Sequence, residues 1–348
     1  MISRVVIKNF KSIGEAGVDL ELKPLTLLVG PNGGGKSSIL EAIAVASQRN
    51  THSHLTDFQS PSKVMHESKV CTVVIEVHFA PIGEETSGGY KLSFGAETHF
   101  DFQPLSENEA VRTNASKLFD ALRRNAFLIR SVRGDVPYLV DARGRPAWVG
   151  LRGENLLLLL AIIFGQLEYR RTADRVAIWG KRFGIEELNA GFRGDIQTGS
   201  DYRDSQLKVA LDLALASSGA RQILTVITQL FWAPEGSLLM IEEPEISLHP
   251  KAQIDVLEMF AEAIREDSKQ IIATTHSHIL LQALGYAVHK RWIKSQDIAV
   301  YHIEKGRAGT KATSLPLGKN GYIKNWVPSY TKVERQLLQE WAKTLPRA

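Results

Sequence analysis

The sequence predicts an α/β fold with a mostly parallel sheet, antiparallel strands near the N-terminus and a helical subdomain inserted into the core. Short apolar runs at residues 238–241, 270–275 and 298–303 are separated by helical patterns, which is typical of parallel strands joined by crossover helices. A glycine-rich segment joins another apolar run to a helix at residues 30–38. Residues 107–191 are mainly helical and basic in pattern, and the core pattern then resumes.

Bulk composition limits the class of protein. The chain has 348 residues, of which 44% are hydrophobic and 23% charged, as in ordinary globular proteins with a large core. The longest apolar run, "LLLLLAIIF" at residues 156–164, is much shorter than the ~20 residues that span a bilayer. No signal-peptide pattern opens the chain, and its single cysteine, Cys71, excludes an intramolecular disulfide, a cysteine-cluster zinc site and an Fe–S cluster. We therefore expect a cytoplasmic protein with no membrane contact.

The first part of the chain reads as short strands followed by one helix. Strands are expected at residues 4–10, 17–22 and 25–30, and an amphipathic helix at residues 36–47. Residues 51–68 are polar and aperiodic, which predicts a mobile loop, and two alternating strands come after it.

The segment "GPNGGGKSS" at residues 30–38 matches the phosphate-binding pattern G-x-x-x-x-G-K-[ST] in full. It follows an apolar strand and opens a helix, which is the context that confirms this motif over an ordinary glycine-rich turn. Glycines let backbone N–H groups wrap phosphates, and the helix N-terminus adds its positive dipole end. Lys36 should reach the β- and γ-phosphates, while the Ser37 hydroxyl should ligate Mg²⁺. The residues predicted to bind ATP here are Asn32, Gly33, Gly34, Gly35, Lys36, Ser37 and Ser38.

Two adjacent glutamates end the apolar run in "SLLMIEEPEISLHP" at residues 237–250. Carboxylates are rarely buried unless they pair or bind a metal, and the alternative is a strand that runs out into a solvated turn. A Mg²⁺ ion held by Ser37 and phosphates usually needs a carboxylate at the end of a neighbouring strand. Glu242 is expected to be that ligand, directly or through a water, and Glu243 to act as general base on the attacking water.

A further apolar strand in "IIATTHSHIL" ends at a histidine. His276 is expected to hydrogen-bond the γ-phosphate and to sense its presence, with His278 as the nearby competitor. A histidine at a strand end is often only structural, so this interpretation depends on the two motifs above.

These segments together resemble the ABC-type ATPase heads of the SMC/RecF/OLD superfamily. The resemblance rests on "GPNGGGKS", "LLMIEEPEISLHP" and "TTHS", and on the opening segment at residues 7–43. The combination of "EEPE" and "LHP" is similar to the OLD-like branch of stand-alone prokaryotic AAA family ATPases, in which the first glutamate replaces the usual aspartate. The resemblance implies a P-loop NTPase fold with an ABC-type head, and ATP and Mg²⁺ as cofactors.

Family heads also carry a signature segment that completes the ATP site of the opposite subunit. The best match is "ASSGARQIL", in which Ser218 and Gly219 open a helix, although it departs from the family's Leu-Ser-Gly-Gly-Gln. An ordinary N-cap serine is the alternative interpretation. Neither Gln103 nor Gln166 can be identified as the glutamine of the family's Q-loop.

The predicted organisation has four parts. Residues 1–105 form the N-terminal part of the ATP-binding core, 106–200 the inserted basic subdomain, 201–316 the C-terminal part of the core and 317–348 a tail. We expect no nuclease domain after the ATPase, no long coiled-coil arm, and a tail that packs on the core or on a partner.

Charge is concentrated in the middle of the chain. Residues 112–193 contain fifteen Lys and Arg against eight Asp and Glu, a local net charge of +7 in a chain whose total is +4. This distribution fits a DNA-binding surface, and the alternative is a solvated helical face.

The resemblance implies an ATP hydrolase that forms a homodimer or higher homo-oligomer with ATP sandwiched between heads. Such a dimer would regulate a separate effector protein, a nuclease in particular, in bacterial anti-phage defence. A RecF-like DNA-binding ATPase of repair or maintenance is the alternative, and a transporter motor is the weakest of the three. The sequence identifies neither the effector nor the trigger.

Overall fold

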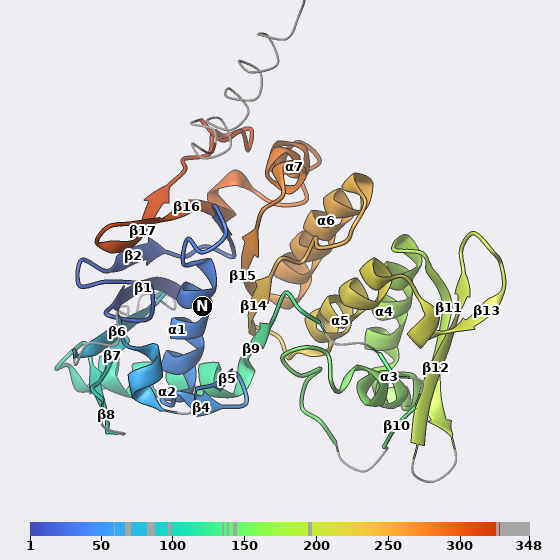
Figure 1. The fold of residues 1–348 in the computed structure, drawn as a ribbon, viewed down its shortest axis with the longest axis horizontal. Coiled ribbons are helices and arrows are strands. Elements are labelled where there is room, and N and C mark those ends of the chain that lie inside the picture. The colour runs from blue at the N-terminus through green and yellow to red at the C-terminus, as the bar shows by residue number, and fades with distance from the viewer. Residues whose placement is uncertain are drawn as a thin grey trace, which may run out of the picture.

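A six-stranded sheet lies at the centre of the molecule in the computed structural model (Figure 1). The structure describes residues 1–58, 60–66, 71–81, 88–96, 99–133, 136–137, 139–141, 145–193, 197–324 and 327. Five strands are parallel and the sixth, at one edge, is antiparallel. In spatial order the strands are β17 (Gly309–Ser314), β16 (Ile298–Gly306), β3 (Leu25–Val29), β15 (Gln270–Thr275), β14 (Leu238–Glu242) and β9 (Ala126–Ile129).

Helices cover both faces of this sheet, which explains why its inner strands are apolar throughout. Every residue of β3, β14 and β15 is buried, as expected for parallel strands covered on both sides. Helix α1 (Lys36–Gln48) lies on one side, and α6 (Pro250–Asp267) and α7 (His278–His289) lie on the other (Figure 1).

A second, antiparallel sheet packs against the outer side of α1. Its side chains alternate between buried and half-buried positions, most clearly in β6, which is the pattern of a sheet with one face on the core. Helix α2 (Glu109–Asn125) follows the last strand of this sheet. The strand order is β2 (Val18–Glu21), β1 (Ile2–Lys8), β6 (Val73–Phe79), β7 (Gly89–Phe94) and β8 (Phe100–Pro104). The predicted fold class, a mostly parallel sheet with N-terminal antiparallel strands, is confirmed.

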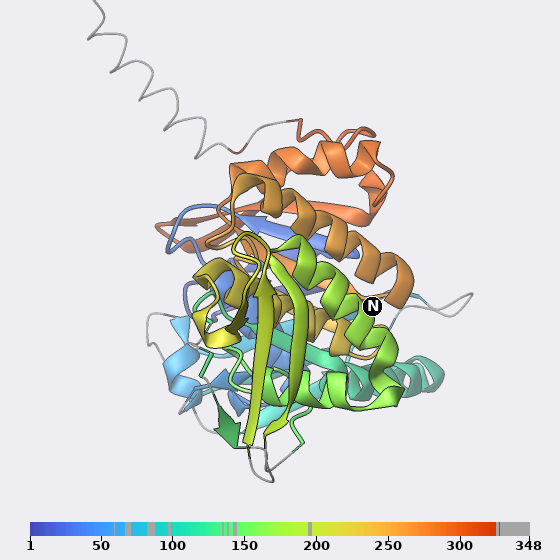
Figure 2. The same ribbon diagram turned by 90° about the vertical axis from the view of Figure 1, so that its right-hand side faces the viewer.

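The inserted region contains more strand than the sequence indicated. Helices α3 (Leu156–Gly165) and α4 (Arg170–Arg182) pack against a small antiparallel sheet (Figures 1 and 2). Helix α5 (Ser218–Trp232), which follows the predicted insertion, packs on α3 and α4. That sheet consists of β10 (Val140–Asp141), β11 (Ile185–Arg193), β12 (Gln197–Asp204) and β13 (Ala210–Asp212). Strand β9, within the range assigned to the insertion, belongs instead to the central sheet. The mainly helical interpretation missed β11 and β12, because β12 buries Thr198 and Ser200, polar residues that hide the alternation.

The loop predicted at residues 51–68 has regular structure in its described part. It forms β4 (His52–Ser53), β5 (Thr56–Asp57) and a 3₁₀ turn at Pro61–Val64. The buried side chains of Leu55 and Val64 anchor it to the core, at a spacing that matches neither helix nor strand periodicity.

Only the beginning of the predicted tail belongs to the described residues. Ile323 and Val327 are buried against the core. Trp326, Tyr330, Leu337, Leu338 and Trp341, expected to pack on the core or a partner, lie outside the described residues. In the part of the chain that the structure describes, no helix has both the length and the apolar character needed to cross a membrane.

Candidate nucleotide-binding site

The predicted motifs meet at one edge of the central sheet. Strands β3, β15 and β14 are neighbours and run parallel, so the residues that follow them gather at the same edge. The phosphate-binding loop follows β3, the glutamate pair ends β14, and His276 follows β15. Ligands of open α/β sheets bind at the carboxyl ends of such strands.

The glycines of the loop are required by a close approach of β16 and β17. A Cβ on Gly30, whose φ is +152°, would lie 2.0 Å from the carbonyl oxygen of Ile303, and one on Gly34 would lie 2.7 Å from it. A Cβ on Gly35, with φ of +107°, would lie 2.1 Å from Thr310 Oγ1. Contacts this short exclude side chains, so the loop keeps a bare backbone that phosphates can approach.

Lys36 lies inside this loop. Its Nζ donates to the carbonyl oxygens of Gly30 and Pro31 at 2.9 Å each. Burial lowers the pKa of Lys36 to about 8, although Glu243, Glu242 and Glu245 oppose this by favouring the ammonium form. The ammonium is therefore placed on the loop and within the field of the carboxylates at the end of β14. No side chain caps helix α1, which leaves its first N–H groups for a ligand.

The two serines of the motif have different environments. Ser37 is exposed at the start of α1, so its hydroxyl is open to a ligand. Ser38 is buried, and its hydroxyl accepts from Ser12 Oγ at 3.0 Å, while Ser12 Oγ accepts from Thr310 Oγ1 at 2.8 Å. The Ser38 side chain thus ties the helix to the core, and the contact with ATP expected for this residue stays a prediction. Asn32 and Gly33 form the exposed tip of the loop.

The glutamates at the end of β14 have separate surroundings. Glu242 is 6% exposed, and its carboxylate accepts from Arg130 Nη1 at 3.3 Å and from the Ser131 N–H at 3.1 Å. Glu243 has a left-handed backbone, with φ of +43°, and its N–H donates to the carbonyl oxygen of Thr274. Because this turn breaks the strand, the two carboxylates face different neighbours.

His276 is the neighbour of the second glutamate. Its Nε2 lies 3.9 Å from Glu243 Oε1. Burial and then Lys36 lower the pKa of His276, with Glu243 acting in the opposite direction. The backbone N–H of His276 donates at 3.1 Å to the buried carboxylate of Glu245. The same carboxylate accepts from Thr275 Oγ1 at 2.6 Å. Burial raises the pKa of Glu245.

The signature match lies at the N-terminus of α5, where the structure assigns the cap to a different serine. Ser217 accepts from the Ala220 N–H, and Ser218 is the exposed first residue of the helix. A Cβ on Gly219 would lie 2.5 Å from the carbonyl oxygen of Ser247. Glycine therefore lets α5 rest directly on the loop that follows the glutamate pair.

Two arginines that contact the glutamate pair, Arg130 and Arg133, were not predicted from the sequence. Arg133 is buried and donates to the carbonyl oxygens of Arg130, Glu242 and Glu243 at 2.9 to 3.0 Å. Burial lowers the pKa of Arg133 to about 10. The segment "AFLIRSVR" at residues 126–133 carried the signal, an apolar run that ends in charged residues, as in the glutamate pair.

The residues present fit a magnesium ion bound with ATP. Ser37 supplies an exposed hydroxyl and Glu242 a carboxylate, the oxygen ligands that Mg²⁺ prefers, and the glycine loop leaves room for phosphates. Among the described residues, no three His, Cys, Asp or Glu side chains form a metal cage. Magnesium bound through one carboxylate and substrate phosphates needs no such cage.

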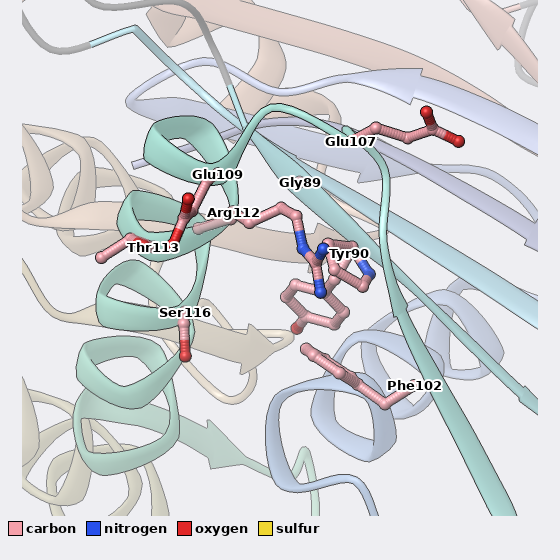
Figure 3. Close-up of a pocket in the computed structure, with 10 residues that line it drawn as sticks. Gly89, Tyr90, Phe102, Glu107, Glu109, Arg112, Thr113 and Ser116 are labelled. Atoms are coloured by element: carbon pink, nitrogen blue, oxygen red, sulfur yellow. The ribbon is translucent and has the colours of Figure 1, made fainter.

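A cavity of about 680 Å³ lies away from this site, between α2 and strands β7 and β8 (Figure 3). Tyr90 and Phe102 form its aromatic wall and Arg112 reaches over it (Figure 3). Its lining includes no residue of the phosphate-binding loop or of the glutamate pair. The candidate nucleotide-binding site is therefore defined by the geometry of the phosphate-binding loop and not by this cavity.

Much of the basic segment is neutralised within the fold. Arg130 contacts the carboxylates of Glu41 and Glu242, and Arg133 donates to the carbonyl oxygen of Glu242. Arg175 pairs with Glu262 and Asp267, and Arg182 Nη2 pairs with Glu258 Oε2 at 2.6 Å. The exposed basic residues of α2 are Arg112, Lys117, Arg123 and Arg124. The predicted DNA-binding surface is therefore narrower than the charge count suggested.

Comparison with known proteins identifies the family of this chain. A family profile described as "AAA domain, putative AbiEii toxin, Type IV TA system" matches residues 25–282. The OLD nuclease of Thermus scotoductus (strain ATCC 700910 / SA-01) is 28% identical over 339 residues, which cover 85% of this chain and 63% of that protein. The DNA replication and repair protein RecF of Vibrio parahaemolyticus serotype O3:K6 is 26% identical over 224 residues, 60% of this chain and 61% of RecF. The chain thus spans less than two thirds of these relatives.

Solved structures show the same fold. The SmcHead bound to the C-winged helix domain of ScpA superposes with a TM-score of 0.62 at 16% identity, covering 91% of this chain and 98% of that one. The SMC head domain from Thermotoga maritima gives a TM-score of 0.53 at 13% identity, with 91% and 99% covered. The profile match spans most of the chain, and the chain therefore belongs to this AAA domain family, as an ABC-type ATPase head of the SMC/RecF/OLD superfamily.

Proposed function

We propose that the protein is a Mg²⁺-dependent ATP hydrolase. The observation that carries the proposal is the glycine loop, which holds the Lys36 ammonium beside the carboxylates at the end of β14. The loop N–H groups and Lys36 bind the phosphates, and Ser37 and Glu242 hold the metal, which would neutralise phosphate charge. Phosphate binding at a helix N-terminus that no side chain caps agrees with the dipole of α1.

In this proposal Glu243 and His276 act on the attacking water and the γ-phosphate. Glu243 accepts the proton of the water as general base, and its carboxylate lies near His276, whereas that of Glu242 contacts Arg130. His276 is held by Glu245 through its backbone and has a lowered pKa, so its neutral ring can hydrogen-bond the γ-phosphate.

We further propose that two copies associate head to head with ATP between them. Ser218 is exposed at the N-terminus of α5, where a hydroxyl and helix N–H groups suit a γ-phosphate of the facing subunit. Gly219 holds this helix end against the loop that follows Glu243, so the signature and the general base are mechanically linked.

The ATP-bound dimer then regulates a separate cytoplasmic effector, which we propose to be a nuclease of anti-phage defence. The similarity to an OLD nuclease over 85% of this chain supports this choice. A second function, DNA binding in repair or maintenance, is favoured by the exposed basic residues of α2 and by the similarity to RecF.

The test compares Lys36→Ala and Glu243→Gln with wild type. Lys36→Ala should abolish ATP binding, because the phosphates lose their main cationic contact. Glu243→Gln should bind ATP and hydrolyse it at least ~100-fold more slowly, the usual scale for loss of a general base. With ATP it should elute as a dimer from a sizing column.

Matched controls lie at the opposite ends of the same strands. Lys23→Ala, before β3, and Glu235→Gln, before β14, repeat the chemical changes on exposed side chains and should behave as wild type. ATP affinity of Lys36→Ala within a few-fold of wild type would refute the loop assignment. A Glu243→Gln protein that stays monomeric with ATP would refute the sandwich.

A further inference from the structure

A chain of ion pairs joins the metal-site glutamate to the helix of the phosphate-binding loop. Arg130 Nη1 lies 3.3 Å from Glu242 Oε1 and 2.8 Å from Glu41 Oε1, so one nitrogen serves two carboxylates. Lys11 Nζ donates to the other oxygen of Glu41 at 2.6 Å. The order is thus Lys11, Glu41, Arg130 and Glu242, from the loop after β1 through α1 to the end of β14.

The burial of these groups makes the arginine necessary in the absence of a metal. The side chains of Glu41 and Glu242 are 6% and 8% exposed, and that of Arg130 is 21% exposed. Two carboxylates so far from water need a neighbouring positive charge, and Arg130 is the cation that both of them contact.

The two contacts of Arg130 are unequal. The contact to Glu41 is shorter by 0.5 Å than the contact to Glu242. Glu242 keeps a second donor, the Ser131 N–H on Oε2, which holds the carboxylate in place independently of the arginine. Arg130 can therefore release Glu242 Oε1 and retain Glu41, and Glu242 remains oriented when it does so.

We propose that Arg130 is a positioning residue that occupies Glu242 until the magnesium ion arrives, and that Glu41 receives the arginine when the metal takes over. The inference rests on the proposed role of Glu242 as a metal ligand. Arg130 and the metal then compete for one carboxylate oxygen, and Glu41 sets the outcome of that competition. The pairs also connect metal binding to α1 and to the segment after β9.

This competition predicts that substitutions of Arg130 and of Glu41 change the Mg²⁺ requirement in opposite directions. In Arg130→Gln no arginine would compete for the Glu242 carboxylate, so less Mg²⁺ should be needed. In Glu41→Gln the arginine loses its closer partner and binds Glu242 more strongly, so more Mg²⁺ should be needed. A purely structural role of the cluster would instead weaken the site in both variants.

The experiment titrates Mg²⁺ against binding of a fluorescent, non-hydrolysable ATP analogue to the full chain. We expect the half-saturating Mg²⁺ concentration to fall about fivefold in Arg130→Gln and to rise about fivefold in Glu41→Gln, each equivalent to ~1 kcal/mol. Arg130→Lys keeps the charge and should stay nearer to wild type. Far-UV circular dichroism and a thermal melt establish that each variant is folded.

Glu242→Gln distinguishes an error in the proposed metal role of Glu242 from an error in the proposed competition with Arg130. If it leaves the Mg²⁺ requirement of binding unchanged, the metal role proposed for Glu242 is wrong. If it changes that requirement while Arg130→Gln and Glu41→Gln shift in the same direction, or both stay within twofold of wild type, the competition is refuted and the metal site stands. Should Arg130→Gln not fold, a half-saturating Mg²⁺ concentration in Glu41→Gln at or below the wild-type value refutes it equally.

Discussion

Lys269 is a buried cation outside the nucleotide site. The residue is 1% exposed, and its Nζ donates to the carbonyl oxygens of Ala233 and Pro234, just after α5. It thereby satisfies carbonyl groups that the end of a helix leaves free. Burial lowers the pKa of Lys269 to about 8, with Asp267 acting in the opposite direction.

This lowered pKa makes stability depend on pH. Between pH 8 and about 10.5 the unfolded chain keeps a proton on Lys269 that the folded protein loses, so the free energy of unfolding rises with pH, by up to about 1.4 kcal/mol per unit. Below pH 8 both states are protonated and this term is constant. Lys269→Met should reduce the slope measured by urea unfolding from pH 8 to 10, and the exposed Lys294→Met should not. The same slope in Lys269→Met and wild type would contradict the assignment.

The placement of candidate site residues in the fold was predictable where one local motif contains them. Lys36 and Glu242 belong to short motifs, at residues 30–38 and 237–250, in which an apolar strand leads directly into a turn that carries the charged residue. Arg130 could not be assigned in this way, because its partner is 112 positions distant and only the pairing of β9 with β14 brings them together. The hydrogen bond between the hydroxyls of Ser12 and Ser38 could not be predicted for the same reason, since Ser12 belongs to another loop.

At the scale of elements, one arginine joins three helices. Arg175 on α4 donates to Glu262 at 2.9 Å and to Asp267 at 2.6 Å, both in α6. Its guanidinium also lies 4.1 Å from the ring centroid of Phe231 in α5. Helix α4 of the inserted region is therefore bound to α6 of the core beside α5, the helix that begins with the predicted signature segment.

Loss of this arginine should destabilise the protein. The Arg175 side chain is 12% exposed, and Arg175→Met leaves the largely buried carboxylate of Asp267 with only the more distant Arg171, so we expect a loss of about 3 kcal/mol in unfolding free energy. Arg170→Met removes a pair with Asp174 whose side chains are 76% and 57% exposed, and should cost less than ~1 kcal/mol. Chemical denaturation of both variants provides the comparison, and equal losses would show that burial does not decide the effect.

Strands with a clear hydrophobic pattern in the sequence were predicted, and strands without one were not. Strands β3, β14 and β15 were predicted because both of their faces are buried and their residues are apolar throughout. Strands β11 and β12 were not, because they pair across an antiparallel sheet that buries threonine, serine and alanine on one face. Such strands are specified by their partners more than by their own composition.

At the scale of the whole molecule, the fold redistributes charge that the sequence concentrates. Of the fifteen Lys and Arg in residues 112–193, Arg130, Arg175 and Arg182 pair with carboxylates of α1, α6 and the end of β14. Exposed basic residues remain on both α2 and α4: the last turn of α2 carries Arg123 and Arg124, whereas Arg170 and Arg171 of α4 lie near the carboxylates of Asp174 and Asp267. A polyanion would therefore meet α2 first, and the face of α4 less strongly.

If the protein binds DNA, Arg123→Glu together with Arg124→Glu should remove most of the affinity, because both side chains are exposed and available to phosphates. The wild-type affinity should fall steeply with salt, with a slope of about −0.9 per phosphate contact in a double-logarithmic plot. Gel retardation of duplex and single-stranded DNA at several salt concentrations, with and without ATP, measures both quantities. Basal ATPase activity should be unchanged, since neither arginine belongs to the nucleotide site.

The matched comparison is Arg170→Glu with Arg171→Glu, which adds the same charge on α4. These arginines already face Asp174 and Asp267, at 3.2 and 3.9 Å, so their reversal should weaken binding less than reversal of the α2 pair. Equal losses would mean that net charge alone governs binding and that α2 is no defined surface. A wild-type protein that retards neither DNA at low salt would assign the basic face of α2 to an acidic protein partner or to solvent, and the regulated effector would then be the partner to seek.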